Sequence, residues 1–182
     1  MNKKVLVAIA EGIEEIEAVC IIDVLRRAGS DVTVASVGDS LEITASRGVV
    51  LVADELIGGC KDQTYDLIAL PGGMVGAENL RDCTILTDML KEQKKSGRYY
   101  AAICASPAVV FASCGLINDR KATCYPSLMK DIKNPVDENV VIDGNCITSQ
   151  GPGTALVFSL KLVEVLYGNS KADEIADAML AG

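Results

Sequence analysis

Histidine is absent from all 182 residues of this chain. Without imidazole, a single chain cannot run a Ser-His-Asp or Cys-His mechanism. Proton transfer near neutral pH must then use a carboxylate, a thiol or a lysine whose pKa has been moved. The chain also lacks the commonest metal ligand, so we predict neither a metal site nor a cofactor.

Other residue types and sequence patterns that are rare or absent narrow the class of protein further. There is no tryptophan and there are only two phenylalanines, so aliphatic side chains must fill the core. The seven cysteines are an odd number without CxxC spacing, which argues against a disulfide framework or a zinc ribbon. Apolar runs of membrane-spanning length are missing, and a net charge of −8 without a basic cluster disfavours nucleic acid as a partner. We therefore expect a reduced, soluble, cytoplasmic protein with one domain over residues 1–182.

Buried strands alternate with amphipathic helices along the chain. Strands are predicted at 4–10, 31–37, 66–70, 99–103 and 121–124, with hairpins at 41–52 (at a sheet edge) and 140–148. Helices are predicted at 14–28, 84–96, 106–114, 154–167 and 171–180, with single turns near 76–80 and 128–132. This order predicts an α/β sandwich with a mostly parallel central sheet.

One cysteine falls at a turn from strand to helix. Residues 99–103 form a short apolar run, Cys104 follows, and Ser106 and Pro107 suit the N-cap and first position of a helix. Backbone N–H groups of the new helix would point at Cys104 and favour its thiolate. The alternative is that Cys104 is an inert, buried small side chain.

Loops at the carboxyl ends of parallel strands are the usual place for a ligand. Glu11-Gly12 follows the first strand and Gly72-Gly73 the third, and the two adjacent glycines could present N–H groups to an anion or simply form a tight turn. Gly151 begins a Gly-Pro-Gly segment that either starts a helix or lines the same pocket.

Glu17 lies on the apolar side of the first predicted helix. Its neighbours at helical spacing are Ile13, Cys20, Ile21 and Val24. Glu14 and Glu15 fall at positions that are more easily solvated. Burial should raise the pKa of Glu17, and a protonated carboxyl can donate a hydrogen bond to a thiolate. Glu17 is thus either the partner of a reactive cysteine or a carboxyl bonded to backbone at a helix or dimer boundary.

Six stretches of the chain, in this order, match the motifs of one family. They are Ala-Glu-Gly-Ile-Glu-Glu-Ile-Glu (10–17), Asp-Val-Leu-Arg-Arg-Ala-Gly (23–29), Ser-Arg-Gly-Val-Val (46–50), Leu-Pro-Gly-Gly (70–73), Ala-Ala-Ile-Cys-Ala-Ser-Pro-Ala (101–108) and Thr-Ser-Gln-Gly-Pro-Gly-Thr (148–154). Together they resemble the parkinsonism-associated deglycase branch of the PfpI superfamily.

The resemblance implies a flavodoxin-like, three-layer fold and a homodimer built partly on the first helix. It implies Cys104 as an oxidation-sensitive nucleophile and Glu17 as its protonated partner. Backbone N–H groups of Gly72, Gly73 and Ala105 would surround the thiol, with Arg47 reaching the site from a partner subunit.

Two functions follow from the resemblance. One is cofactor-free conversion of methylglyoxal-type α-oxoaldehydes, or of their early glycation adducts. The alternative is an oxidant sensor or redox-regulated chaperone in which Cys104 becomes a sulfinate. A third reading is a degenerate member that binds a partner through its dimer surface.

The chain departs from the family pattern at three positions. Tyr125 stands where many relatives have a histidine before proline, so any proton relay there would use a group of far higher pKa. Ala105 replaces the histidine that follows the cysteine in protease-like members, which argues against proteolysis. Gln150 replaces an arginine of some relatives and removes a positive charge.

Overall fold

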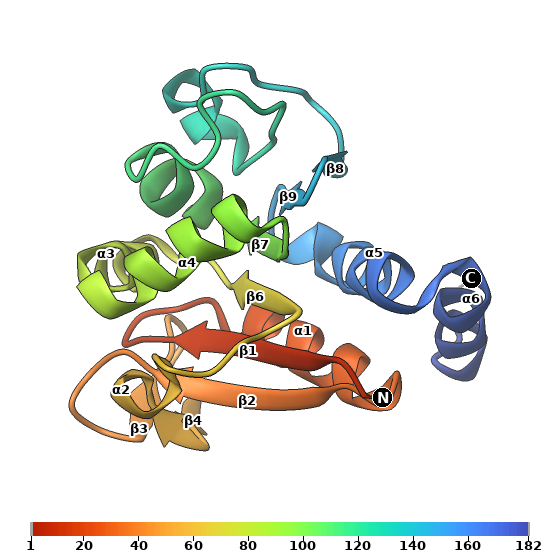
Figure 1. The fold of residues 1–182 in the computed structure, drawn as a ribbon, viewed down its shortest axis with the longest axis horizontal. Coiled ribbons are helices and arrows are strands. Elements are labelled where there is room, and N and C mark those ends of the chain that lie inside the picture. The colour runs from red at the N-terminus through yellow and green to blue at the C-terminus, as the bar shows by residue number, and fades with distance from the viewer. Residues whose placement is uncertain (1, 182) are drawn as a thin grey trace.

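A seven-stranded sheet forms the centre of the molecule, and the computed structural model describes residues 2–181 (Figure 1). Its order is β5-β2-β1-β6-β7-β9-β8. The strands are β1 (Lys4–Ile9), β2 (Asp31–Ser36), β5 (Glu55–Leu56), β6 (Leu67–Leu70), β7 (Tyr99–Ile103), β8 (Val140–Asp143) and β9 (Cys146–Ser149). All neighbouring pairs are parallel except β8 and β9, which form the predicted antiparallel hairpin.

Helices cover both faces of this sheet, and in Figure 1 α4 lies in front of it and α1 behind. The longer helices are α1 (Glu15–Arg27), α3 (Met74–Asp82), α4 (Thr84–Ser96), α5 (Ala155–Tyr167) and α6 (Asn169–Ala178). Short helices occur at α2 (Ile57–Cys60), η1 (Pro107–Ala112), η2 (Pro126–Asp131) and η3 (Pro152–Thr154). Helix α1 packs on α5, and α5 on α6. The fold is a flavodoxin-like α/β sandwich, as predicted.

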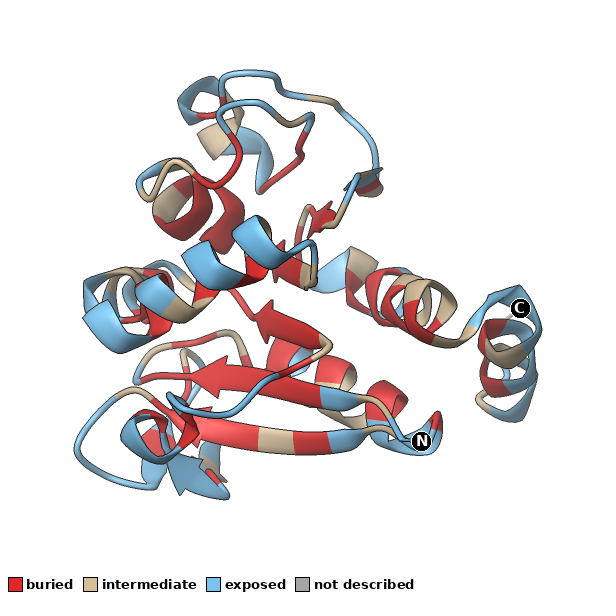
Figure 2. Cartoon of the chain, viewed as in Figure 1, coloured by how far each residue is buried: buried red, intermediate tan, exposed pale blue. Residues whose placement is uncertain are grey.

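The central strands have no exposed side because helices cover them from both directions. Every residue of β6 is buried, and so is β1 after Lys4, which explains their continuous apolar runs (Figure 2). Aliphatic side chains dominate the core, and Tyr100 and Phe111 add an edge-to-face pair with ring centroids 5.2 Å apart. Within residues 2–181, no helix combines the length and apolar character needed to cross a membrane.

Several sequence-based predictions of local structure were wrong. The hairpin of β3 (Glu42–Thr44) and β4 (Val50–Val52) forms a separate two-stranded sheet, and β5 provides the sheet edge instead. Residues 121–124 form no strand and only an isolated bridge at Ala122. The N–H of Thr123 donates instead to the Thr148 side chain, so the backbone pairing does not continue.

Candidate active site

The loops that follow β1, β6 and β7 meet in one cavity of about 940 Å³. Parallel strands bring their carboxyl ends to the same edge of the sheet, so segments far apart in the sequence meet there. The lining residues are Glu11, Gly12, Glu14, Thr44, Ala45, Ser46, Arg47, Gly73, Met74, Val75, Cys104, Ala105, Tyr125, Ser127, Leu128 and Pro152. The cavity therefore contains both the predicted cysteine and the loop at Glu11-Gly12.

Cys104 occupies a strained turn between β7 and η1. Its φ of 64° is in the left-handed region, which non-glycine residues rarely adopt. Two backbone hydrogen bonds hold this conformation, since Cys104 N–H donates to Ser149 O (3.0 Å) and Cys104 O accepts from Tyr125 N–H (2.8 Å). The side chain is 8% exposed, and the backbone N–H groups of Gly73 and Ala105 lie close enough to its sulfur to lower the thiol pKa. This geometry presents the sulfur to the cavity at a rigid elbow.

Glu17 lies directly behind the cysteine, and its side chain is fully buried. Its Oε2 accepts a 2.6 Å hydrogen bond from Gly72 N–H, and its carboxyl interacts with the Cys104 thiol. A Cβ atom at Gly72 would stand 2.5 Å from Cys104 Cβ and 2.9 Å from Glu17 Oε2, so only glycine lets the three residues pack this closely. Burial raises the pKa of Glu17 to about 7, against the opposing effect of the Gly72 N–H.

The pKa of Cys104 differs from our expectation of a favoured thiolate. Burial raises it to about 12, and the negative charge of Glu17 adds to the increase, whereas the N–H groups of Gly73 and Ala105 lower it. The two acids share one environment and titrate as a coupled pair. While Glu17 keeps its proton, it carries no negative charge and therefore does not oppose the formation of a thiolate on Cys104.

Arg47 lines this cavity from its own chain, in contrast to the expectation that it arrives from a partner subunit. Glu15 holds the loop that carries it, because its carboxylate accepts hydrogen bonds from Ser46 Oγ (2.9 Å) and Arg47 N–H (2.8 Å). The prediction that Glu15 is easily solvated was wrong, since it is only 7% exposed. Burial by itself raises its pKa, but the backbone N–H of Glu15 itself, together with Ser46, Arg47 and Val49, outweighs that effect and the net pKa is lowered.

Of the other two expected site residues, Tyr125 lines the cavity and Gly151 does not. Tyr125 lines the cavity and is 47% exposed, and its ring lies beside Gly151, while the adjacent Pro152 contributes to the wall. Sequence reasoning missed Glu14, which lines the cavity and caps α1 by accepting a hydrogen bond from Glu17 N–H (3.1 Å). Its position two residues after the Glu11-Gly12 loop was the available signal.

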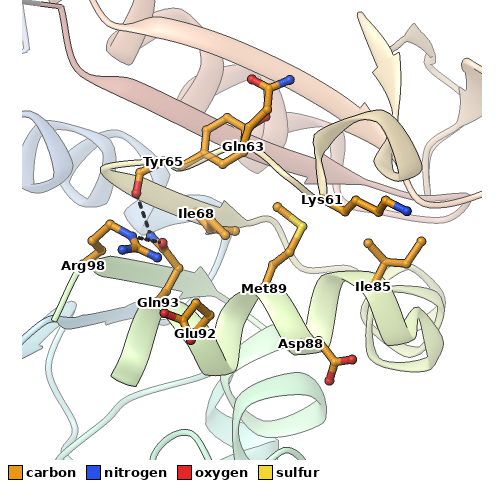
Figure 3. Close-up of a pocket in the computed structure, with 10 residues that line it drawn as sticks. All are labelled: Lys61, Gln63, Tyr65, Ile68, Ile85, Asp88, Met89, Glu92, Gln93 and Arg98. Atoms are coloured by element: carbon orange, nitrogen blue, oxygen red, sulfur yellow. Dashed lines mark hydrogen bonds between the residues drawn. The ribbon is translucent and has the colours of Figure 1, made fainter. Parts of the chain in front are cut away.

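A second cavity of about 340 Å³ lies between α4 and the loop before β6 (Figure 3). Its buried Gln93 donates to Tyr65 O (3.2 Å) and accepts from Arg98 Nε (2.7 Å). Gln93 also donates to Tyr99 O (2.8 Å), so it ties α4 to the starts of β6 and β7. We interpret this side chain as part of the scaffold.

The flavodoxin-like sheet, the strained cysteine and its buried carboxyl define a class of cysteine-elbow α/β proteins. Within that class, the model of the DJ-1/PfpI family matches residues 3–165, and the chain belongs to this family. This agrees with the resemblance seen in the sequence motifs.

Individual relatives match over most of the chain. Protein DJ-1 homolog B of Arabidopsis thaliana is 49% identical over 97% of this chain, which spans only 41% of that protein's length. The glutathione-independent glyoxalase DJR-1.2 of Caenorhabditis elegans is 39% identical, with 91% of this chain and 89% of that protein covered. The structure of oxidised Toxoplasma gondii DJ-1 superposes with a TM-score of 0.96 at 49% identity, covering 98% of each chain.

Proposed function

We propose that this protein is a cofactor-free glyoxalase or deglycase that acts on methylglyoxal-type α-oxoaldehydes or their early glycation adducts. The observation that carries the proposal is the strained Cys104, open to the cavity and backed by the buried carboxyl of Glu17. The similarity to a protein named as a glutathione-independent glyoxalase supports the same reaction class.

In the proposed reaction, the Cys104 thiolate adds to the aldehyde carbon and forms a hemithioacetal. N–H groups of Gly73 and Ala105 are the proposed surroundings of the developing negative charge, whereas the N–H of Gly72, expected there as well, is bound to Glu17 Oε2. A proton then moves from this carbon to its neighbour and leaves a lactoyl thioester on the sulfur. Water hydrolyses the thioester to lactate and restores the thiol, so that methylglyoxal plus water gives lactic acid.

We assign different proton-handling roles to two carboxyl groups. Glu17 is fully buried behind the sulfur, where it can hold a proton beside Cys104 Sγ and exchange it with the thiol. Glu14 lines the cavity and is placed to move a proton between the substrate carbons. Arg47 and Tyr125 are proposed contacts for the substrate oxygens, with Gly151 as a support beside the Tyr125 ring.

The direct test is conversion of methylglyoxal by purified protein without added glutathione. We expect lactate, and we expect Cys104→Ala to abolish its formation because the nucleophile is gone. Cys60→Ala is the matched control, since Cys60 is fully buried in α2 and is absent from the cavity lining. Equal turnover by the Cys104→Ala variant would disprove the proposal.

A second candidate function is oxidant sensing through Cys104, alone or as a redox-regulated chaperone. The same N–H groups and the Glu17 carboxyl would hydrogen-bond a cysteine sulfinate, and a structure of a relative is reported in the oxidised form. Mild peroxide followed by mass spectrometry should give a sulfinate at Cys104 and not at the other six cysteines. Oxidation spread evenly over all seven would rule out a dedicated sensor.

The family resemblance and the exposed apolar side chains on α1 and β4 also support a homodimer as the working form. The small-molecule partner that we propose for this protein is the reactive aldehyde or its glycation adduct.

A further inference from the structure

The hydroxyl of Ser106 does not cap the helix that follows it. The sequence predicts Ser106 as an N-cap, but the structure gives it no capping hydrogen bond and places it in a helical conformation. Its Oγ instead donates to the carbonyl of Pro71, 35 positions earlier in the chain, at 2.5 Å. The side chain is fully buried and does not line the cavity.

The Pro71 carbonyl and the Gly72 N–H belong to the same peptide group. Ser106 binds one side of this peptide, and Glu17 Oε2 accepts from the other side at 2.6 Å. The following peptide carries the Gly73 N–H, which favours the thiolate of Cys104. Since Gly72 and Gly73 restrict backbone rotation less than any other residues would, side chains must supply the restraint.

We propose that Ser106 is a positioning residue, whose hydroxyl fixes and polarises the Pro71–Gly72 peptide so that its N–H group points at Glu17. When a hydroxyl group donates a hydrogen bond to a peptide carbonyl, the N–H of the same peptide becomes a stronger hydrogen-bond donor, because hydrogen bonds in a chain polarise one another. The inference rests on the Cys104/Glu17 pair of the proposed function. It adds a residue that acts on the pair from outside the cavity.

The effect on Glu17 has a definite direction. The titratable groups that face Glu17 are Cys104 from the elbow and Glu14 from the start of α1, and the Gly72 N–H opposes the increase in its pKa that burial causes. Removing the Ser106 hydroxyl weakens this N–H donor and leaves the carboxylate less stable. Glu17 should then hold its proton to higher pH.

The experiment compares the pH titration of Glu17 in three variants of the full chain. The infrared band of the protonated carboxyl, assigned by its loss in Glu17→Gln, reports the titration without any substrate. Ser106→Ala removes the hydroxyl, and Ser106→Thr keeps it. The matched control is Ser159→Ala, because Ser159 is also fully buried and its Oγ donates to a backbone carbonyl, that of Ala155, at 2.7 Å.

We expect the midpoint to move upward by about 0.5 to 1 pH unit in Ser106→Ala, with Ser106→Thr and Ser159→Ala close to the parent. An unchanged midpoint in Ser106→Ala would overturn the proposal. So would an equal shift in Ser159→Ala, which would reflect general loosening, or an equal shift in Ser106→Thr, which would reflect packing. Failure of aldehyde turnover would contradict the proposed function and leave this titration interpretable.

Discussion

At the scale of single residues, the buried carboxyl of Glu17 makes stability depend on pH. Its pKa is raised from 4.5 to about 7 in the folded protein, so between these values the folded state binds more protons than the unfolded chain. The stabilisation is complete below pH 4.5 and is lost as the pH rises through 7. From pH 5 to 8, Glu17 should lower the free energy of unfolding by about 2 kcal/mol.

Urea unfolding of the parent and of Glu17→Gln at pH 5 and pH 8 measures this contribution. The substitution should remove the decrease and make the variant more stable relative to the parent at pH 8 than at pH 5. Glu15→Gln is the control from the same helix, since Glu15 has a lowered pKa and contributes with the opposite sign. The same pH dependence in Glu17→Gln and in the parent would contradict the raised pKa.

The position and conformation of a site residue could be predicted from the sequence only where residues close to it in the chain determine them. The burial of Glu17 follows from helical spacing, and the position of Cys104 follows from an apolar run that ends before a Ser-Pro pair. The left-handed φ of Cys104 has no such signal, because the hydrogen bonds that hold it come from Ser149 and Tyr125. The partner of Ser106 is equally remote, since the N-cap pattern predicts that its Oγ accepts from a helix N–H, whereas the Oγ donates to the Pro71 carbonyl.

At the scale of elements, sequence periodicity predicted the long helices, the buried strands and both hairpins, but it missed β5 and α2. β5 has two residues and α2 has four, too few for a period to be recognised. Helix α3 runs from Met74 to Asp82, longer than the predicted turn at 76–80, because glycines at its start hid the pattern. Gly76 in this helix allows α3 to pack closely against the loop after β1.

We predict that Gly76→Ala destabilises the contact between α3 and the loop that follows β1. A Cβ at Gly76 would lie 2.5 Å from Ile13 Cα and 2.6 Å from Ile13 N, and backbone atoms cannot move aside as a flexible side chain can. We expect a loss of about 1 to 3 kcal/mol in the free energy of unfolding. The change should also disturb the cavity, since α3 begins at its wall with Met74.

Gly58→Ala in α2 provides the control for that prediction. A Cβ at Gly58 would meet nothing within 4 Å, so alanine should leave stability unchanged or raise it by up to about 1 kcal/mol. Denaturant unfolding of both variants decides the point. Equal effects of the two substitutions would mean that α3 can shift away from Ile13 at little cost.

At the scale of the whole molecule, one side carries apolar residues that the chain itself leaves uncovered. Ile16 on α1 is 58% exposed, Val19 is 46% exposed, and Val52 on β4 is 68% exposed. Val19 and Val52 line the same shallow cavity, so the two elements form one surface. Helix α1 also carries Glu17 on its inner side, which places the proposed dimer contact and the candidate site on opposite sides of one helix.

The proposed dimer makes a prediction that distinguishes the contact surface on α1 and β4 from other exposed apolar positions. Ile16→Lys should convert the protein to monomers, measured by sedimentation velocity, because an ammonium group would be buried without a partner at the interface. Ile85→Lys on α4, which lies across the sheet from α1, should leave the dimer intact although Ile85 is 37% exposed (Figure 1). Because α1 also supports Glu17, loss of the dimer should be accompanied by a shift in the titration of that carboxyl. A parent protein that sediments as a monomer would refute the interface.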